Sequence, residues 1–277
     1  MELLKSPAKI NLFLDVLSKE NDGYHNIKSI LTLIDLHDEI IIKESASLNI
    51  NFSGEFSNEI NQNNIQILFD FLIKKNFIKS DKYSINITKN IPVGAGLGGG
   101  SSNIAAILNF LCSKKIIKYN EALNIARELG SDIEFFFDTA PAIIIGKGNV
   151  LRRINTFKEF YLLLVYPNFT LSTEKVYRNN SQFDAENQIA LDKEDYDFDN
   201  IMQLSSNSLQ AAAIGLCPDI KYIIDKLASM KGSLYSRMTG SGSCCFAVFD
   251  EKDLAQEAAN TLKRHYPDWW IYQSKII

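Results

Sequence analysis

A glycine-rich segment carries the clearest chemical signal in this chain of 277 residues. It reads Pro92-Val-Gly-Ala-Gly-Leu-Gly-Gly-Gly-Ser-Ser102 and lies between an alternating segment at 83–88 and an apolar stretch at 104–112. Glycines let backbone N–H groups approach a bulky anion, and a helix beginning near Ser101 or Ser102 adds free amides and the positive end of its dipole. We therefore interpret the segment as a phosphate-binding loop rather than a flexible linker.

The surrounding pattern excludes two common phosphate-binding folds. No Gly-Lys-Ser/Thr sequence follows the glycines, as a Walker A loop requires. Gly94-x-Gly96-x-x-Gly99 matches the dinucleotide fingerprint, but the preceding segment alternates apolar and polar residues, whereas the first strand of a doubly wound sheet is buried on both faces. The acidic residue expected about 20 positions later, after a second buried strand, is also missing. The loop therefore belongs to an α+β architecture with antiparallel strands.

Composition indicates an ordinary globular protein. Hydrophobic residues make up 46% of the chain and charged residues 22%, and the length predicts about two domains. With 29 Lys+Arg against 33 Asp+Glu, the net charge of −4 gives no overall basic field for nucleic acid or an anionic membrane. The four cysteines form no C-x-x-C pair, and the start lacks an export signal, so we expect a cytoplasmic protein with no membrane partner.

Hydrophobic periodicity predicts the elements around the loop. A boundary near residue 155 separates the two halves, and the polar, acidic residues 181–199 are expected to form a surface loop. Strands are expected at residues 10–15, 27–36, 39–42, 83–88, 160–165, 233–238, 244–249 and 269–272. Helices are expected at residues 65–72, 104–111, 121–129, 201–214, 220–230 and 254–264.

Several short motifs together resemble those of the GHMP kinases, a family of small-molecule kinases. Ser6-Pro-Ala-Lys-Ile-Asn-Leu12 resembles the first family motif, Pro92–Ser102 the nucleotide-binding motif, and Arg237-Met-Thr-Gly-Ser-Gly-Ser-Cys244 the third. Asp22-Gly-Tyr-His25 and Leu129-Gly-Ser-Asp132 are similar to one branch of that family. The motifs follow one another in the expected order, which is far more specific than any one of them.

The resemblance implies a two-domain α+β fold with mostly antiparallel sheets, packed helices and the active site between the domains. Residues 1–155 are then the N-terminal nucleotide-binding domain and residues 156–277 the C-terminal GHMP kinase domain. The implied reaction is ATP-dependent phosphorylation of the 2-hydroxyl of a cytidine-diphosphate-linked polyol, methylerythritol, in non-mevalonate isoprenoid synthesis, with Mg²⁺ accompanying ATP.

The resemblance assigns catalysis to Lys9 and Asp132. Asp132 is expected to accept the proton of the substrate hydroxyl, and a capping box of Ser131 and Glu134 is expected to start a helix whose dipole keeps Asp132 ionised. Lys9 is expected to support that ionised state and to stabilise charge on the transferred phosphoryl group. Without the other motifs, the simpler interpretations would be that Asp132 only helps to start a helix and that Lys9 is a surface lysine on an edge strand.

The resemblance also assigns the binding residues. His25 is expected to hydrogen-bond to cytosine, Tyr24 to contact the nucleotide end, and Tyr177 to provide a second ring, so that the base stacks between two rings. Asn11 is expected to contact the substrate, and Asn64 to border the adenine pocket. The residues expected to bind ATP are Pro92, Val93, Gly94, Ala95, Gly96, Leu97, Gly98, Gly99, Gly100, Ser101, Ser102 and Asn64.

One departure and two alternatives stay open. Many family members carry Asn-Asp-Leu-Glu where this chain has Asn207-Ser-Leu-Gln210, so any role of that helix start in metal or substrate binding is in doubt, and no metal ligand is assigned. One alternative is another kinase of the family that acts on a sugar or a mevalonate-pathway acid, although an acidic substrate calls for an arginine where Tyr24 and His25 stand. The other is an RNA- or nucleotide-binding module without catalysis, against which the net acidity counts.

Overall fold

Two long strands dominate the N-terminal part of the chain. The structure is a computed structural model that describes residues 1–79, 82–155, 157–183 and 196–277. Strand β1 (Glu2–Lys19) pairs with β2 (His25–Glu44), and a turn at residues 21–23 lies between them. The predicted separation of strands at 27–36 and 39–42 is wrong: one continuous strand spans both ranges, and Asp38 between them is buried and hydrogen-bonded.

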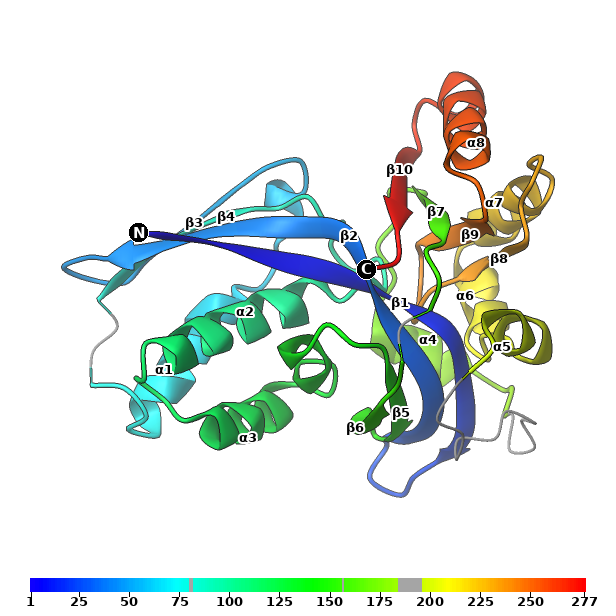
Figure 1. Cartoon of the computed structure of the whole chain (residues 1–277). Helices are drawn as coiled ribbons and strands as arrows, with labels where there is room; N and C mark the ends of the chain where they lie inside the picture. Colours follow the sequence, from blue (N-terminus) through cyan, green and yellow to red (C-terminus); the bar gives the residue numbers. More distant parts are fainter. Residues whose placement is uncertain (80–81, 156, 184–195) are drawn as a thin grey trace. The chain divides into compact units, whose positions relative to one another are not determined.

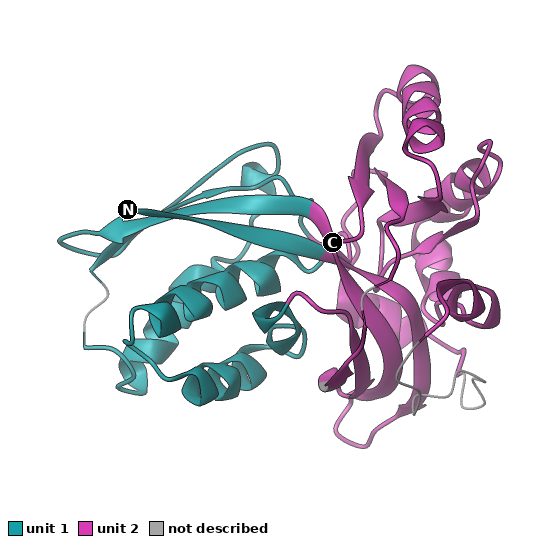
Figure 2. Ribbon diagram, in the orientation of Figure 1, with its two compact units in different colours: residues 1–8, 36–93, 98–138 teal, residues 9–35, 94–97, 139–277 magenta. Residues whose placement is uncertain are grey.

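Contacts group the chain into two units, which Figure 2 colours separately. Both long strands and the glycine-rich segment contribute residues to each unit, so neither unit is one continuous stretch of chain. The division at residue 155 therefore remains a prediction about the two family domains. The first unit comprises residues 1–8, 36–93 and 98–138, and the second comprises residues 9–35, 94–97 and 139–277.

The first unit combines a sheet with helices. Its elements after β2 are β3 (Asn49–Ser53), η1 (Ser57–Glu59), α1 (Asn64–Lys74), β4 (Tyr83–Thr88), α2 (Gly99–Ser113), α3 (Tyr119–Leu129) and η2 (Glu134–Phe137). Strand β4 pairs antiparallel with β2 and parallel with β3. Helix α2 contacts α1 and α3, and the three helices lie together in Figure 1. The helix predicted at 65–72 and the strand predicted at 83–88 are confirmed, since the spaced apolar residues of α1 are its buried ones.

The second unit is built on two sets of strands. Its elements are β5 (Ala142–Gly146), β6 (Asn149–Arg153), β7 (Tyr161–Tyr166), α4 (Thr173–Asn179), α5 (Phe198–Leu204), α6 (Gln210–Leu216), α7 (Asp219–Ala228), β8 (Tyr235–Met238), β9 (Cys245–Phe249), α8 (Lys252–His265) and β10 (Trp270–Lys275). Strand β5 pairs antiparallel with β2 and β6, and the other sheet has the order β10-β7-β9-β8. Helices α7 and α8 contact that four-stranded sheet. Antiparallel pairing predominates, which confirms the predicted α+β class.

The helix predicted at 201–214 is interrupted. Between α5 and α6, the backbone pairs with β1 instead: the Leu14 N–H donates to the Ser206 carbonyl (3.0 Å), and the Ser208 N–H donates to the Leu14 carbonyl (2.8 Å). Of the predicted polar loop 181–199, residues 184–195 lie outside the described part of the chain. Within the described ranges, no helix has both the length and the hydrophobicity needed to cross a bilayer.

A buried ion pair anchors the chain just before the glycine-rich segment. The Lys89 ammonium pairs with the Asp38 carboxylate, and their side chains are 5% and 0% exposed. The same carboxylate accepts hydrogen bonds from the backbone N–H groups of Asn90 (2.8 Å) and Ile91 (2.9 Å). These charge-assisted bonds offset the cost of burying Asp38 and fix the backbone that leads into Pro92.

We expect Asp38→Ala to lower the free energy of unfolding by about 3 kcal/mol or more, because the Lys89 ammonium and two N–H groups lose their buried acceptor. Urea unfolding followed by circular dichroism measures the loss. Asp225→Ala is the control, since it breaks an ion pair with Lys221 on α7 whose side chains are 58% and 59% exposed. That change should cost less than about 1 kcal/mol, and equal losses in both variants would contradict the anchoring role.

Candidate active site

In the second unit, residues 94–97 of the glycine-rich segment lie between the first and third motifs. The Lys9 N–H of β1 donates to the Leu97 carbonyl (3.0 Å). The Cys244 N–H, next to the start of β9, donates to the Ala95 carbonyl (3.2 Å). Three segments that are far apart in the sequence are therefore joined by backbone hydrogen bonds.

Two glycines permit this close approach. Gly96 has a φ of +79°, and a Cβ there would lie 2.4 Å from the Thr239 carbonyl oxygen. A Cβ on Gly240 would lie 3.0 Å from the Gly96 carbonyl oxygen and 3.2 Å from the Lys9 Nζ. Side chains at these positions would push the motifs apart. The second unit thus brings Lys9, the loop and the third motif together.

Lys9 and Asn11 are neighbours on the same face of β1, and both are 4% exposed. The Lys9 ammonium donates to the Asn11 Oδ1 (2.5 Å). The backbone N–H of Asn11 donates to the Thr239 Oγ1 (2.9 Å), which adds a further link between the first and third motifs. The sequence predicted Lys9 and Asn11 but gave no signal for Thr239 as their support.

The hairpin turn after β1 presents Tyr24, which is 61% exposed. Asp22 accepts a hydrogen bond from the Tyr24 N–H (3.1 Å) and pairs with Lys147, whose ammonium lies 5.0 Å from the Tyr24 ring centroid. Lys147 lies between two glycines in the turn that joins β5 to β6. Sequence reasoning missed it because the contact joins turns more than 120 residues apart.

His25 and Tyr177 lie together, with ring centroids 4.8 Å apart. Burial, with a smaller contribution from Lys19, lowers the pKa of His25. The imidazole is therefore neutral at pH 7 and offers one donor and one acceptor. The ring of Tyr177 contacts His25, whereas the ring of Tyr24 faces Lys147.

In the first unit, α2 begins at Gly99, two residues before the predicted start. Its N-cap, Gly98, has no side chain to occupy the first amides, so these amides suit an anion. Ser6 of the first motif lies within hydrogen-bond distance of Ser102 (2.8 Å), whose side chain is buried in this helix. A Cβ on Gly100 would lie 2.8 Å from the Asn64 Nδ2, which places Asn64 beside the helix start.

Asp132 is half-buried in the turn between α3 and η2. The predicted capping box is wrong, because Ile133 is the N-cap of η2 and no side chain caps it there. The Glu134 carboxylate instead accepts two hydrogen bonds from the Arg127 guanidinium of α3 (2.8 and 2.5 Å). This bidentate ion pair links α3 to η2 across the turn that contains Asp132.

The predicted site residues are divided between the two units. Catalytic pairing of Lys9 with Asp132 remains a prediction, since these residues belong to different units. The predicted residues in the second unit are Lys9, Asn11, Tyr24, His25, Gly94, Ala95, Gly96, Leu97 and Tyr177. Those in the first unit are Asn64, Pro92, Val93, Gly98, Gly99, Gly100, Ser101, Ser102 and Asp132.

Residues 207–210, where the resemblance predicts acidic side chains, support the third motif. The Asn207 side-chain amide donates to the carbonyls of Met238 (3.0 Å) and Gly240 (2.8 Å). Gln210 accepts a hydrogen bond from the Met238 N–H (3.1 Å), and Ser208 accepts one from the backbone of β1. These neutral side chains therefore hold the third motif and β1 in place through hydrogen bonds.

In the described ranges, no group of three or more His, Cys, Asp or Glu side chains is placed to hold a metal.

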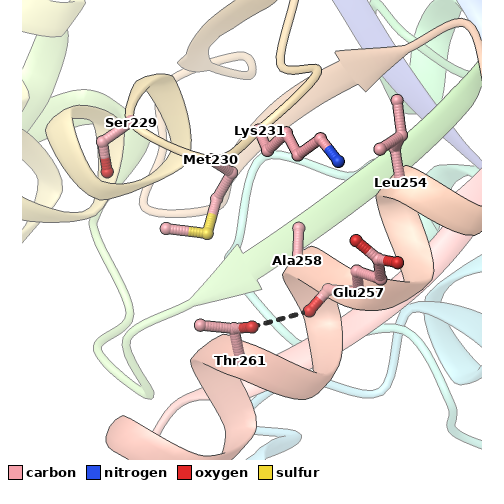
Figure 3. A pocket seen from close by; sticks show the side chains of 7 residues that line it. All are labelled: Ser229, Met230, Lys231, Leu254, Glu257, Ala258 and Thr261. Atoms are coloured by element: carbon pink, nitrogen blue, oxygen red, sulfur yellow. Dashed lines mark hydrogen bonds between the residues drawn. The ribbon is translucent and has the colours of Figure 1, made fainter.

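A cavity of about 240 Å³ lies between the end of α7 and helix α8 (Figure 3). Its lining includes Met230, Lys231, Leu254 and Glu257. None of the predicted site residues lines this cavity, so it is separate from the candidate active site.

Two family descriptions match the chain: "GHMP kinases N terminal domain" over residues 63–146 and "GHMP kinases C terminal" over residues 191–268. A 4-diphosphocytidyl-2-C-methyl-D-erythritol kinase of Pelagibacter ubique is 36% identical over 279 residues, which covers 99% of this chain and 98% of the relative. The kinase of the same name from Pseudothermotoga lettingae is 38% identical over 264 residues, or 91% and 93% of the two chains.

Two solved structures of kinases also align with nearly the whole chain. A crystal structure of 4-(cytidine 5'-diphospho)-2C-methyl-D-erythritol kinase aligns with a TM-score of 0.77 at 25% identity and covers 99% of each chain. The L. major mevalonate kinase aligns with a TM-score of 0.68 at 16% identity and covers 100% of this chain and 96% of that one. The second likeness concerns the fold alone.

We expect Gly96→Ala to lower the free energy of unfolding by more than about 1 kcal/mol, because alanine is strained at positive φ and its Cβ would meet the Thr239 carbonyl. Thermal and urea unfolding measure the change. Gly215→Ala in α6 is the matched control, since a Cβ there meets no described heavy atom within 4 Å and alanine favours a helix. An unchanged Gly96→Ala protein would show that the close approach is not required.

Proposed function

The chain belongs to the GHMP kinase family, and on that premise we propose that it transfers the γ-phosphoryl group of ATP to the 2-hydroxyl of 4-diphosphocytidyl-2-C-methyl-D-erythritol. The observation that carries the proposal is the junction of Lys9, the glycine-rich loop and the third motif in the second unit. The identity of 36% along nearly the whole chain to a kinase named for this substrate supports the choice of acceptor. The reaction would be a step of non-mevalonate isoprenoid synthesis.

ATP is the phosphoryl donor of this kinase family. We propose that residues 92–102 hold its phosphates through backbone N–H groups and the start of α2, and that Asn64 borders the adenine. Mg²⁺ is part of the proposal. It binds proteins through one or two carboxylates together with substrate phosphates, so it can arrive on ATP without a dedicated cluster of ligands. When bound, it neutralises phosphate charge.

Phosphoryl transfer depends mainly on positioning and electrostatics. In the proposed reaction, the substrate 2-hydroxyl oxygen forms a bond to the γ-phosphorus as the bond to ADP breaks, and Asp132 accepts the hydroxyl proton. Lys9 stabilises the charge that develops on the transferred group. The buried position of Lys9 strengthens this interaction, because water screens it little.

The cytidine end would bind at the hairpin. A neutral imidazole at His25 can hydrogen-bond to cytosine, and the rings of Tyr24 and Tyr177 can stack on it. Asn11 would contact the polyol beside Lys9. A cytoplasmic location is also proposed, and it is supported by the four cysteines, all of which are free thiols.

The decisive assay measures ADP release by the purified protein with 4-diphosphocytidyl-2-C-methyl-D-erythritol, mevalonate or galactose as acceptor. We expect turnover with the first compound alone. Preference for mevalonate or galactose would indicate another kinase of the family. Retention on immobilised RNA without ATP turnover would favour a binding module.

We expect Lys9→Ala and Asp132→Asn each to reduce kcat by at least about 100-fold, because each removes a charge that acts on the reacting atoms. Steady-state ADP release measures kcat, and circular dichroism verifies the fold. Lys221→Ala and Asp225→Asn on α7 are the matched controls and should keep the original rate. Near-normal turnover by Lys9→Ala or Asp132→Asn would disprove the role of that residue.

We expect His25→Ala to raise the KM for the cytidylyl substrate about tenfold, the equivalent of one lost hydrogen bond, with little effect on the KM for ATP. Initial rates at varied concentrations of each substrate separate the two constants. His265→Ala, at the exposed end of α8, is the control. An unchanged KM for the cytidylyl substrate would mean that His25 does not read cytosine.

A further inference from the structure

A buried hydroxyl on β2 completes a chain of hydrogen bonds that begins at the Lys9 ammonium. Lys9 donates to the Asn11 Oδ1 (2.5 Å), and the Asn11 Nδ2 donates to the Ser29 Oγ (2.9 Å). The Ser29 hydroxyl in turn donates to the Phe13 carbonyl. Ser29 is 0% exposed, so this series of hydrogen bonds is shielded from solvent at the Ser29 end.

The direction of each bond follows from the chemistry of the groups. An ammonium only donates, so the Asn11 atom that faces Lys9 must be the carbonyl oxygen. The single hydroxyl hydrogen of Ser29 is used by Phe13, so Ser29 can only accept from Asn11, and the atom facing it must be the NH₂ group. Ser29 and Lys9 therefore require the same orientation of the Asn11 amide.

Pairing with other segments fixes Ser29 and Asn11, the two residues that lead to Lys9 in this series of hydrogen bonds. Ser29 lies opposite Ile144 in the antiparallel pairing of β2 with β5. The backbone N–H of Asn11 is bound to the Thr239 hydroxyl of the third motif. Asn11 is thus fixed at its backbone by Thr239 and at its side chain by Ser29. The Lys9 ammonium thereby receives a fixed hydrogen-bond acceptor at the end of its long side chain.

We propose that Ser29 is a positioning residue for phosphoryl transfer: it orients the Asn11 amide and thereby holds the Lys9 ammonium in place. The inference rests on the proposed function of Lys9. Because small displacements of a catalytic group reduce the rate strongly while ground-state binding changes little, loss of the Ser29 hydroxyl should affect kcat more than KM.

Loss of a hydroxyl with a purely structural role should lower stability without lowering kcat. Ser274 provides a matched control for Ser29. Ser274 on β10 belongs to the same unit, is 3% exposed and donates to the Asp35 Oδ1 (2.5 Å). Ser29→Ala and Ser274→Ala each remove one buried hydroxyl, so both should lower the unfolding midpoint. Only the first removes a contact that leads to Lys9.

The test measures ADP release with 4-diphosphocytidyl-2-C-methyl-D-erythritol by the full-length protein. We expect Ser29→Ala to lower kcat about tenfold, with the KM for ATP changed by less than about twofold. Ser274→Ala should keep kcat. An unchanged kcat for Ser29→Ala, or an equal loss for both variants, would overturn the proposal.

A double-variant cycle tests the route through Asn11. If Ser29 acts by orienting that amide, Ser29→Ala should change kcat by less than about twofold in a protein that already carries Asn11→Ala. An undiminished effect in that background would show that Ser29 acts elsewhere and would overturn the proposal. The proposed function fails separately, through absence of turnover in the unmodified protein. Turnover by that protein, combined with a normal Ser29→Ala rate, would reject the positioning role alone.

Discussion

Contact between one backbone and another, without side chains between them, is the constraint on which the candidate site depends. Residues 94–97 approach the third motif so closely that the Gly96 Cα faces the Thr239 carbonyl, and Gly240 lies against the loop in return. Backbone hydrogen bonds from Lys9 and Cys244 then hold the loop at Leu97 and Ala95. The glycines therefore let the strand that carries Lys9 reach the loop, and in the proposed function they also leave backbone amides open to a phosphate.

Burial of polar side chains gives this arrangement its rigidity. Near the glycine-rich segment, the Asp38 carboxylate binds an ammonium and two backbone N–H groups. Between β1 and β2, the Lys9 ammonium, the Asn11 amide and the Ser29 hydroxyl form a continuous series of hydrogen bonds. Burying any of these polar groups without a partner would raise the free energy of the folded state, but matched hydrogen bonds offset most of that desolvation penalty. Such networks have one low-energy geometry, which is what a phosphoryl-transfer site needs.

Local patterns predicted much of the fold, and long-range contacts account for the errors. The apolar spacing of α1 and the alternation of β4 depend on burial of one face, so both were found. A polar residue inside β2 and a favourable helical pattern at 201–214 were misread, because partners distant in sequence, Lys89 and Leu14, decide those conformations. The motifs identified Lys9 and Asn11, whereas Ser29 has no local signal. Its role depends on pairing between strands.

The neutral segment at 207–210 differs from the acidic segment that the resemblance predicts. Ser208 and Gln210 stand where acids are expected, yet both accept hydrogen bonds from backbone N–H groups. A carboxylate could accept the same bonds, so the shared requirement is an acceptor, not a charge. Ser208 is 0% exposed, and a carboxylate there would need further donors to offset its desolvation. With neutral acceptors, Asn207 can still hold the Gly240 carbonyl, and the third motif keeps its place against the loop.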